Sequence, residues 1–182
     1  MSTITREQLG RLLVEFEHTA YRLELLAAYA EDSEAAALAS FAAGQEPDIY
    51  PGKRGWLEKV RAAAVTGRVM QRVHVLTEPL SPYLQFEIGW SYSLNEGVGE
   101  DIRILPTDSA PAVVTEAGDY WLLDSRTLVR MDYDSGGQLA DISRIGDADA
   151  IITANYARDA ALHYAVPLKQ YAKRLPQLMR AS

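Results

Sequence analysis

Basic side chains recur on segments of this sequence that alternate like β-strands. Arg72 precedes His74 by two residues in one such segment, and three more arginines stand between apolar neighbours: Arg22, Arg103 and Arg130. A guanidinium fork matches phosphate and carboxylate in shape and charge, so arginines on one sheet face could bind a small anion or the phosphate of a nucleotide. His74 could add a general base or a phosphate contact. These five residues form the first candidate site.

The same arginines have a simpler interpretation as structural ion pairs. Their predicted partners are carboxylates at nearby positions: Glu24, Glu87, Asp101 or Asp132. A cross-strand Arg–Asp pair explains the alternation of charge without any ligand, and we prefer it. For His74 a structural hydrogen bond is likewise the simpler explanation.

Acidic residues are frequent, but none stands in a complete catalytic or metal-binding motif. Asp132 and Asp134 begin like a calcium loop, yet the later ligands are missing, so we predict a turn. Ser81 has no Gly-x-Ser-x-Gly context and fits a helix cap. Glycine-rich nucleotide loops are absent. We therefore predict no catalytic residue, no metal and no cofactor, and we favour a non-enzymatic protein.

A third group of interesting residues is aromatic. Tyr83, Phe86 and Trp90 are three and four positions apart, so they share one face of a predicted helix beside a second apolar stripe. One stripe belongs to the core. The other is a second buried face, which is the simpler alternative, or an exposed surface for a partner. Together with Arg126 at a predicted turn, these aromatics form a candidate partner-binding site.

Length and composition define the setting of these groups. The 182 residues fit one domain, 1–182, and the absence of cysteine excludes disulfides and thiolate metal sites and is consistent with the cytoplasm. The 18 basic and 25 acidic residues give a net charge of −7, which argues against direct binding to nucleic acid and to anionic membranes. No apolar run approaches the roughly 18 residues of a membrane span.

The periodicity of apolar residues predicts alternating helices and strands. Helices are expected over 5–16, 33–43, 56–66, 81–97, 148–163 and 166–179. Strands are expected over 21–25 (with continuation of the first helix as the alternative), 68–76, 102–105, 119–134 as a hairpin turning at Asp124-Ser125-Arg126, and 139–145. Residues 44–54 and 107–118 are expected to be loops, with Val113-Val114 a brief strand. This order predicts an α+β fold: a mixed β-sheet with helices on its faces and a C-terminal helical segment.

Several of these segments, taken in order, resemble one family. They include Tyr21-Arg22-Leu23-Glu24, Arg72-Val73-His74-Val75-Leu76, Leu80-Ser81-Pro82-Tyr83-Leu84-Gln85-Phe86-Glu87, Gly99-Glu100-Asp101-Ile102-Arg103-Ile104-Leu105-Pro106 and Tyr120-Trp121-Leu122-Leu123-Asp124-Ser125-Arg126. The set is similar to the actinobacterial family catalogued as DUF6879, from about Phe16 to Tyr171. The resemblance brings no activity with it. It implies proteins found near helix-turn-helix regulators and small companion proteins.

A weaker resemblance concerns architecture. A strand with a basic outer face at Arg72, a helix, a short strand and the hairpin resemble half of a phospholipase D-type fold. If Asp124 occupies the Asp position of that family's His-x-Lys signature, Ala117 and Asp119 stand where the His and the Lys would be. The nucleophile is then missing, so we expect a degenerate, non-catalytic version of that fold.

These observations lead to two functional hypotheses. The preferred one is a cytoplasmic, non-enzymatic binding or regulatory accessory protein that acts through a protein partner, such as a helix-turn-helix transcriptional regulator, a companion protein or a second copy of itself. The alternative is a sensor or enzyme that binds a small anion or a nucleotide phosphate at the Arg/His cluster. We expect neither a membrane nor direct nucleic-acid binding.

Overall fold

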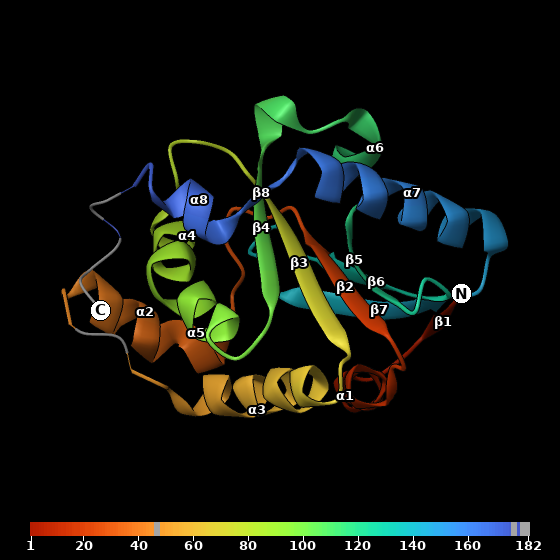
Figure 1. The fold of residues 1–182 in the computed structure, drawn as a ribbon, viewed down its shortest axis with the longest axis horizontal. Coiled ribbons are helices and arrows are strands. Elements are labelled where there is room, and N and C mark those ends of the chain that lie inside the picture. The colour runs from red at the N-terminus through yellow and green to blue at the C-terminus, as the bar shows by residue number, and fades with distance from the viewer. Residues whose placement is uncertain (46–47, 176–177, 179–182) are drawn as a thin grey trace.

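The computed structural model describes residues 1–45, 48–175 and 178, and these residues build one mixed β-sheet flanked by helices (Figure 1). Within this part of the chain the sheet has eight strands in the order β1-β7-β6-β5-β2-β3-β4-β8. Their bounds are Ser2–Thr3 (β1), Thr19–Glu24 (β2), Val69–Leu76 (β3), Asp101–Pro106 (β4), Asp119–Leu123 (β5), Thr127–Tyr133 (β6), Leu139–Ile145 (β7) and Val166–Pro167 (β8). β2, β3 and β4 run parallel to one another, and the remaining neighbours are antiparallel. The predicted α+β fold is confirmed.

Helices cover both faces of this sheet. The longer ones are Arg6–Glu15 (α1), Ala35–Ala42 (α2), Pro51–Val65 (α3) and Ala148–Tyr164 (α7). Shorter ones are Ala112–Thr115 (α6), Leu168–Ala172 (α8) and the 3₁₀ turns Asp32–Glu34 (η1) and Thr107–Ser109 (η3). Figure 1 shows α7 and α3 on opposite sides of the sheet. The alternation of side chains along each strand therefore separates two cores.

One core lies under α7, where Tyr21 and Leu23 of β2 pack with Ala154 and Ala161. On the other face, apolar residues of α1 and α3 pack against Ala20 and neighbouring strands. Arg22, Glu24, Arg72 and His74 point to this second face. The face of β3 that was predicted to be basic and exposed is therefore covered by helices. His74 on this face is fully buried.

The helix after Ser81 contains an irregular turn that the sequence does not reveal. Ser81 caps Pro82–Phe86 (α4) by accepting from the Leu84 amide at 3.1 Å, and Pro82 occupies the first turn, as predicted. The helix then widens to a π-turn over Glu87–Ser91 (η2) and returns to α-geometry over Tyr92–Glu96 (α5). Such π-turns are rare and occur frequently at functional sites.

Helix α3 begins earlier than predicted. The expected start at Trp56 is wrong, because Pro51 opens the helix in its first turn and Gly52 continues it. A Cβ at Gly52 would lie 2.6 Å from Ser33 Cβ, so the glycine permits a close approach of α3 to η1. The five additional residues bring Lys53 under the sheet.

Three other local predictions need correction. Val113-Val114 belong to the short helix α6 rather than to a strand. The last helix was expected over 166–179, but Val166 and Pro167 pair with β4 and the helix covers only Leu168–Ala172. Residues 176, 177 and 179 of that prediction lie outside the described residues. β1 was not predicted, because two residues carry no period.

The hairpin β5–β6 has the predicted turn, and Asp124 adds a long-range connection. Asp124 and Ser125 both have positive φ, of 51° and 57°, which aspartate tolerates better than most residues. The Asp124 carboxylate accepts hydrogen bonds from the backbone amides of Glu17, His18 and Thr19 at 2.9, 2.7 and 3.0 Å. The turn thus holds the segment that joins α1 to β2.

None of the helices in the described ranges combines the length and the apolar character that a bilayer span requires.

Candidate functional site

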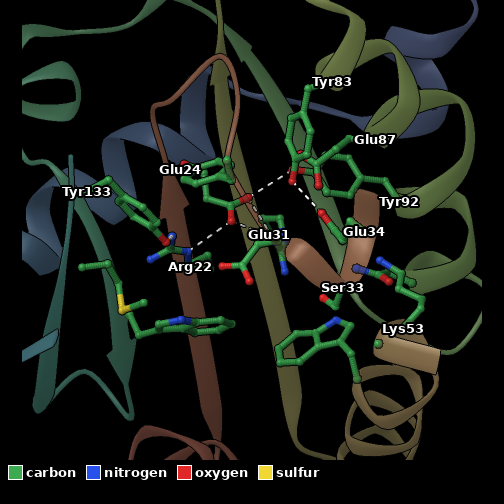
Figure 2. A pocket seen from close by; sticks show the side chains of 17 residues that line it. Arg22, Glu24, Glu31, Ser33, Glu34, Lys53, Tyr83, Glu87, Tyr92 and Tyr133 are labelled. Carbon is green, nitrogen blue, oxygen red and sulfur yellow. Dashed lines mark hydrogen bonds and ion pairs between the residues drawn. The ribbon is translucent and has the colours of Figure 1, made fainter. Parts of the chain in front are cut away.

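A pocket of about 260 Å³ lies between the sheet and the helices of the second face (Figure 2). Its floor is formed by β2 and β3, and its walls come from η1, α3 and the α4–η2–α5 helix. Glu31, Ser33 and Gly52 line it and are at least partly exposed, so they mark its mouth. Charged and aromatic residues supply most of the remaining lining: Arg22, Glu24, Tyr29, Glu34, Lys53, Trp56, Arg72, Tyr83, Glu87, Tyr92, Trp121 and Tyr133.

Arg72 and Glu24 form the central ion pair of this site. Arg72 Nη1 donates to both carboxylate oxygens of Glu24, at 2.7 and 2.8 Å, and its Nε donates to Glu100 at 2.9 Å. The guanidinium also lies over the rings of Trp56 and Tyr92, with centroid distances of 5.9 and 5.5 Å. Burial alone would raise the pKa of Glu24, but Arg72 and Arg22 outweigh it and lower that pKa well below its usual range.

Arg22 extends the network toward β5 and β6. Its Nε donates to Glu24 at 3.3 Å, and its Nη2 donates to Asp119 at 3.1 Å and to the Tyr133 hydroxyl at 3.0 Å. Asp119 also accepts from the Tyr29 hydroxyl and from the Leu25 amide. Burial raises the pKa of Asp119 despite the opposing charge of Arg22. The site is therefore a continuous buried network rather than a set of isolated pairs.

His74 sits at the end of this network with both ring nitrogens engaged. Nε2 donates to the Leu26 carbonyl at 2.9 Å, and Nδ1 lies 2.6 Å from the Tyr92 hydroxyl. Tyr92 in turn donates to Glu24 at 3.1 Å, which leaves its oxygen free to accept from Nδ1. Burial alone would lower the pKa of His74, but Glu87 and Glu24 raise it overall. Hydrogen bonding and pKa together favour the imidazolium form.

Three buried polar atoms at the pocket lack hydrogen bonds. Among the described residues, five buried side-chain atoms have no hydrogen-bond partner, and three of them belong to pocket-lining residues: Arg22 Nη1, Glu87 Oε2 and Asn95 Oδ1. Glu87 Oε2 lies 3.4 Å from His74 Nδ1, whose hydrogen bond goes to Tyr92. The three side chains are only 3%, 5% and 1% exposed. Buried polar groups are nearly always satisfied, so these atoms indicate a site for a polar guest.

The other side of the pocket is crowded with acidic groups. Glu34 accepts from the hydroxyls of Tyr50 and Tyr83 at 2.8 and 2.9 Å. Burial, together with nearby Glu87, raises the pKa of Glu34. Lys53 donates to Ser91 Oγ at 2.6 Å, and its own pKa is lowered by burial and by Arg72. Figure 2 shows Lys53, Glu34 and Glu87 across the cavity from Arg22.

One group of side chains in the described part has the spacing of a metal site. Single ligand atoms of Glu24, His74 and Glu87 lie within 4.8 Å of one another. However, both Glu24 oxygens are held by Arg72, and His74 Nδ1 contacts Tyr92. A divalent cation would have to break these contacts and lie close to a guanidinium, so the donor set does not favour a metal.

The structure separates the five residues of the predicted anion site. Arg22 and Arg72 line the pocket, and His74 joins the same network through Tyr92 and Glu24. Arg103 and Arg130 lie on the opposite face of the sheet, because each is out of phase with Arg22 in the strand register. All four arginines form ion pairs: Arg22 and Arg72 contact Glu24, Arg103 contacts Asp101 at 3.2 Å, and Arg130 contacts Asp132 at 3.0 Å. The last two pairs lie within one strand rather than across strands as predicted, because both partners belong to β4 and to β6 respectively.

The predicted partner-binding aromatics lie in the core. Tyr83, Phe86 and Trp90 are all buried, and they pack with Phe41 and Leu178. The alternative of a second buried face is therefore correct, and these three rings cannot form an exposed surface because α2 covers them. Arg126 does lie exposed at the hairpin turn, where it contacts Glu17 at 2.7 Å.

Several residues of the pocket were not among the predicted site residues. Lys53 was missed because its segment was predicted to be a loop, and Tyr29 lies in an irregular segment without any motif. Glu100 directly precedes β4, and Asp119 is the first residue of β5. No sequence motif marks either of them as a site residue. Asn95 could have been found only from the structure, because nothing in the sequence marks its oxygen as unpaired.

Fold and site together define an α+β protein with a buried, charged and aromatic pocket on one face of a mixed sheet. A family model matches residues 7–173, and its description is "Domain of unknown function (DUF6879)". The chain therefore belongs to the DUF6879 family. No curated protein matches the sequence. The phospholipase D-type resemblance receives no support from these comparisons.

Proposed function

We propose that this chain is a non-enzymatic binding protein whose pocket takes up a small polar ligand. The observation that supports this most is the set of unpaired, buried atoms at the pocket, one donor on Arg22 and one acceptor each on Glu87 and Asn95. A volume of about 260 Å³ is slightly below the roughly 300–1,000 Å³ of drug-sized sites, so the ligand is small. We keep the cytoplasm as its predicted location, as the lack of cysteine suggests.

The test is a thermal-shift screen of the full chain against defined compounds: inorganic phosphate, nucleosides, amino acids, monosaccharides and amines. A ligand at a hundred times its dissociation constant stabilises a protein by about 2.7 kcal/mol, which corresponds to roughly 5–10 °C for a chain of this length. We expect at least one compound to raise the melting temperature in a dose-dependent way.

Asn95→Leu separates a binding role of these atoms from a structural one. Replacing an unpaired buried amide by an apolar side chain of similar size should leave the unliganded protein as stable or more stable, while the ligand-induced shift disappears. Asp119→Asn is the contrast, because this carboxylate is fully bonded and its loss should lower the melting temperature. A screen without any shift, or an Asn95→Leu protein that binds normally, would show the proposal to be wrong.

A protein partner is a second candidate function. Ile152 and Tyr156 are each 66% exposed and lie four residues apart, so they form an apolar strip on α7. This strip supports the idea of a binding or regulatory accessory protein that acts through a regulator, a companion protein or a second copy. Arg126, at the β5–β6 turn, remains a predicted contact for the partner.

Pull-down of an expressed helix-turn-helix regulator or companion protein encoded beside this gene, with light scattering for self-association, tests the partner hypothesis. The double variant Ile152→Ser/Tyr156→Ser should lose any complex. Val65→Ser on α3 serves as the control, because Val65 is also exposed and lies on another helix. No complex at micromolar concentration would count against this function.

A further inference from the structure

The pocket holds more negative than positive charge. Apart from Glu31 at the mouth, which pairs with Arg6 at 3.6 Å, five carboxylates belong to the pocket or to its ion pairs: Glu24, Glu34, Glu87, Glu100 and Asp119. Four basic groups oppose them: Arg22, Lys53, Arg72 and His74. Counted in their ionised forms, the carboxylates are in excess even when His74 is protonated. An unbalanced buried charge is costly, and a bound cation would relieve it.

The excess is concentrated on one side of the cavity. Both arginines are already shared among Glu24, Glu100 and Asp119. Glu34 and Glu87 contact no lysine or arginine within 4 Å among the described residues, and Lys53 is turned to Ser91 instead. Glu87 Oε2 and Asn95 Oδ1, which accept no hydrogen bond, lie four positions before and four positions after Ser91 on the same helix, and Glu87 Oε2 is 3.4 Å from His74 Nδ1.

An ammonium group fits this side best. It donates up to three hydrogen bonds and carries the missing charge. Among the tyrosines that line the pocket, Tyr83 lies on this side: its hydroxyl donates to Glu34 at 2.9 Å, and its ring centroid is 6.2 Å from that of Tyr29. Aromatic faces bind organic cations well when water is excluded.

The Arg22 side of the pocket favours an uncharged hydrogen-bond acceptor. Arg22 Nη1 has no partner, but the charge of Arg22 is balanced by Glu24 and Asp119. A phosphate or carboxylate placed there would add negative charge to an already acidic cavity. A hydroxyl or carbonyl oxygen can accept the hydrogen bond without this penalty.

We infer that the pocket binds a small primary amine that also carries a neutral oxygen acceptor, as in amino alcohols and amino sugars. This inference rests on the proposed ligand-binding function and specifies its ligand class. Glu87 and Asn95 hold the ammonium, and Arg22 Nη1 donates to the oxygen.

Matched compounds that differ in the amine test the inference. Ethanolamine, putrescine and glucosamine are titrated into the full chain by calorimetry beside ethylene glycol, butane-1,4-diol and glucose, with inorganic phosphate and Mn²⁺ alone as further probes. We expect ethanolamine or glucosamine to bind at least tenfold more tightly than its hydroxyl counterpart and than putrescine, which lacks the oxygen. Binding of the neutral compounds, phosphate or Mn²⁺ in preference to the amines overturns the inference, as does the absence of binding by every amine.

Variants assign the binding to the pocket. Glu87→Gln keeps the shape of the side chain and should weaken amine binding at least tenfold, whereas Glu96→Gln on the same helix, outside this pocket, should leave it unchanged. Asn95→Leu provides a second loss of binding if Glu87→Gln folds poorly. Equal binding by wild type and both pocket variants excludes this site.

The outcomes also separate the inference from the proposed function. If the amines fail but another compound of the screen gives an Asn95-dependent shift, the ligand class is wrong and the binding function stands. If no compound binds at all, both fail and the cavity holds water alone.

Discussion

At the scale of single residues, Asp124 joins parts of the chain that are far apart in sequence. Its carboxylate accepts from three consecutive amides, 105 to 107 positions away. Partial burial opposes ionisation, but these donors and Arg126 lower the pKa of Asp124 overall. The ionised form is therefore the one that the fold stabilises.

Asp124→Asn should lower the free energy of unfolding by about 2–3 kcal/mol at neutral pH, since hydrogen bonds to charged groups contribute about 1.5–3 kcal/mol. A lowered folded pKa stabilises the fold above the unfolded value of about 3.9, and this contribution is lost as pH falls through the folded pKa. The difference between wild type and variant in urea unfolding should therefore shrink in acid. Asp132→Asn, at an exposed pair with Arg130, should change stability by no more than about 0.5 kcal/mol. A pH-independent difference would contradict this explanation.

His74 leads to a pH dependence of the opposite sign. Its pKa is raised in the folded protein, so its contribution to stability is complete below the unfolded pKa of about 6.5 and is lost as pH rises through the folded pKa. Urea unfolding at a series of pH values above about 6.5 should show a fall in stability that is flatter in His74→Gln. His163→Gln, at an exposed position of α7, should keep the slope of the wild type. Parallel slopes in all three proteins would show that His74 does not carry the proton.

The sequence predicted part of this residue-scale picture. Alternation along β2 and β3 singled out Arg22, Arg72 and His74, and neighbouring carboxylates suggested their ion pairs. The partners supplied by distant segments, Glu100 and Asp119, were out of reach because no local pattern encodes which strands become neighbours. The unpaired state of an atom such as Asn95 Oδ1 depends on every surrounding group.

At the scale of elements, the π-turn shapes the pocket wall. Glu87 starts this turn, and Gly89 lies within it where space is scarce. A Cβ at Gly89 would lie 2.9 Å from the Leu178 carbonyl oxygen and 3.0 Å from Phe41 Cε2. A Cβ at Gly55 in α3 would meet nothing within 4 Å.

The two glycines should respond in opposite directions to the same substitution. Gly55→Ala should stabilise the protein by up to about 1 kcal/mol, because alanine favours the helix. Gly89→Ala gains the same propensity but should cost about 1–3 kcal/mol through overpacking. Chemical denaturation measures both. Equal stabilisation by the two variants would mean that the turn can relax away from Phe41 and Leu178.

Helix ends and irregular turns were the least predictable elements. The cap at Ser81-Pro82 correctly predicts the start of a helix. Pro51 predicts a loop, but proline is also common in a first helical turn, where the structure places it. The π-turn has no such sequence signal. It is a response to packing on several sides at once.

At the scale of the whole molecule, the sheet combines the parallel strands β2, β3 and β4, which lie within residues 19–106, with the antiparallel strands β5, β6 and β7, which lie within residues 119–145. The α+β class was predictable, because the order of helices and strands already implied it. The strand order was not, since β2 has β3 on one side and β5 on the other. Only the folded chain shows that the pocket needs both halves.

This strand order also governs how the protein can be made. β2 is synthesised early, but its neighbour β5 (Asp119–Leu123) is synthesised about 100 residues later. β1 likewise cannot pair until β7 (Leu139–Ile145) has been synthesised. Contacts between such distant segments slow folding, and the open strand edge is exposed to aggregation meanwhile.

A chain that ends after residue 106 should therefore show no cooperative urea transition and should aggregate, because Arg22 would be left without Asp119 and β2 without β5. A sharp transition in that fragment would contradict the expectation. We therefore expect the nascent protein to need protection from aggregation until the hairpin has emerged.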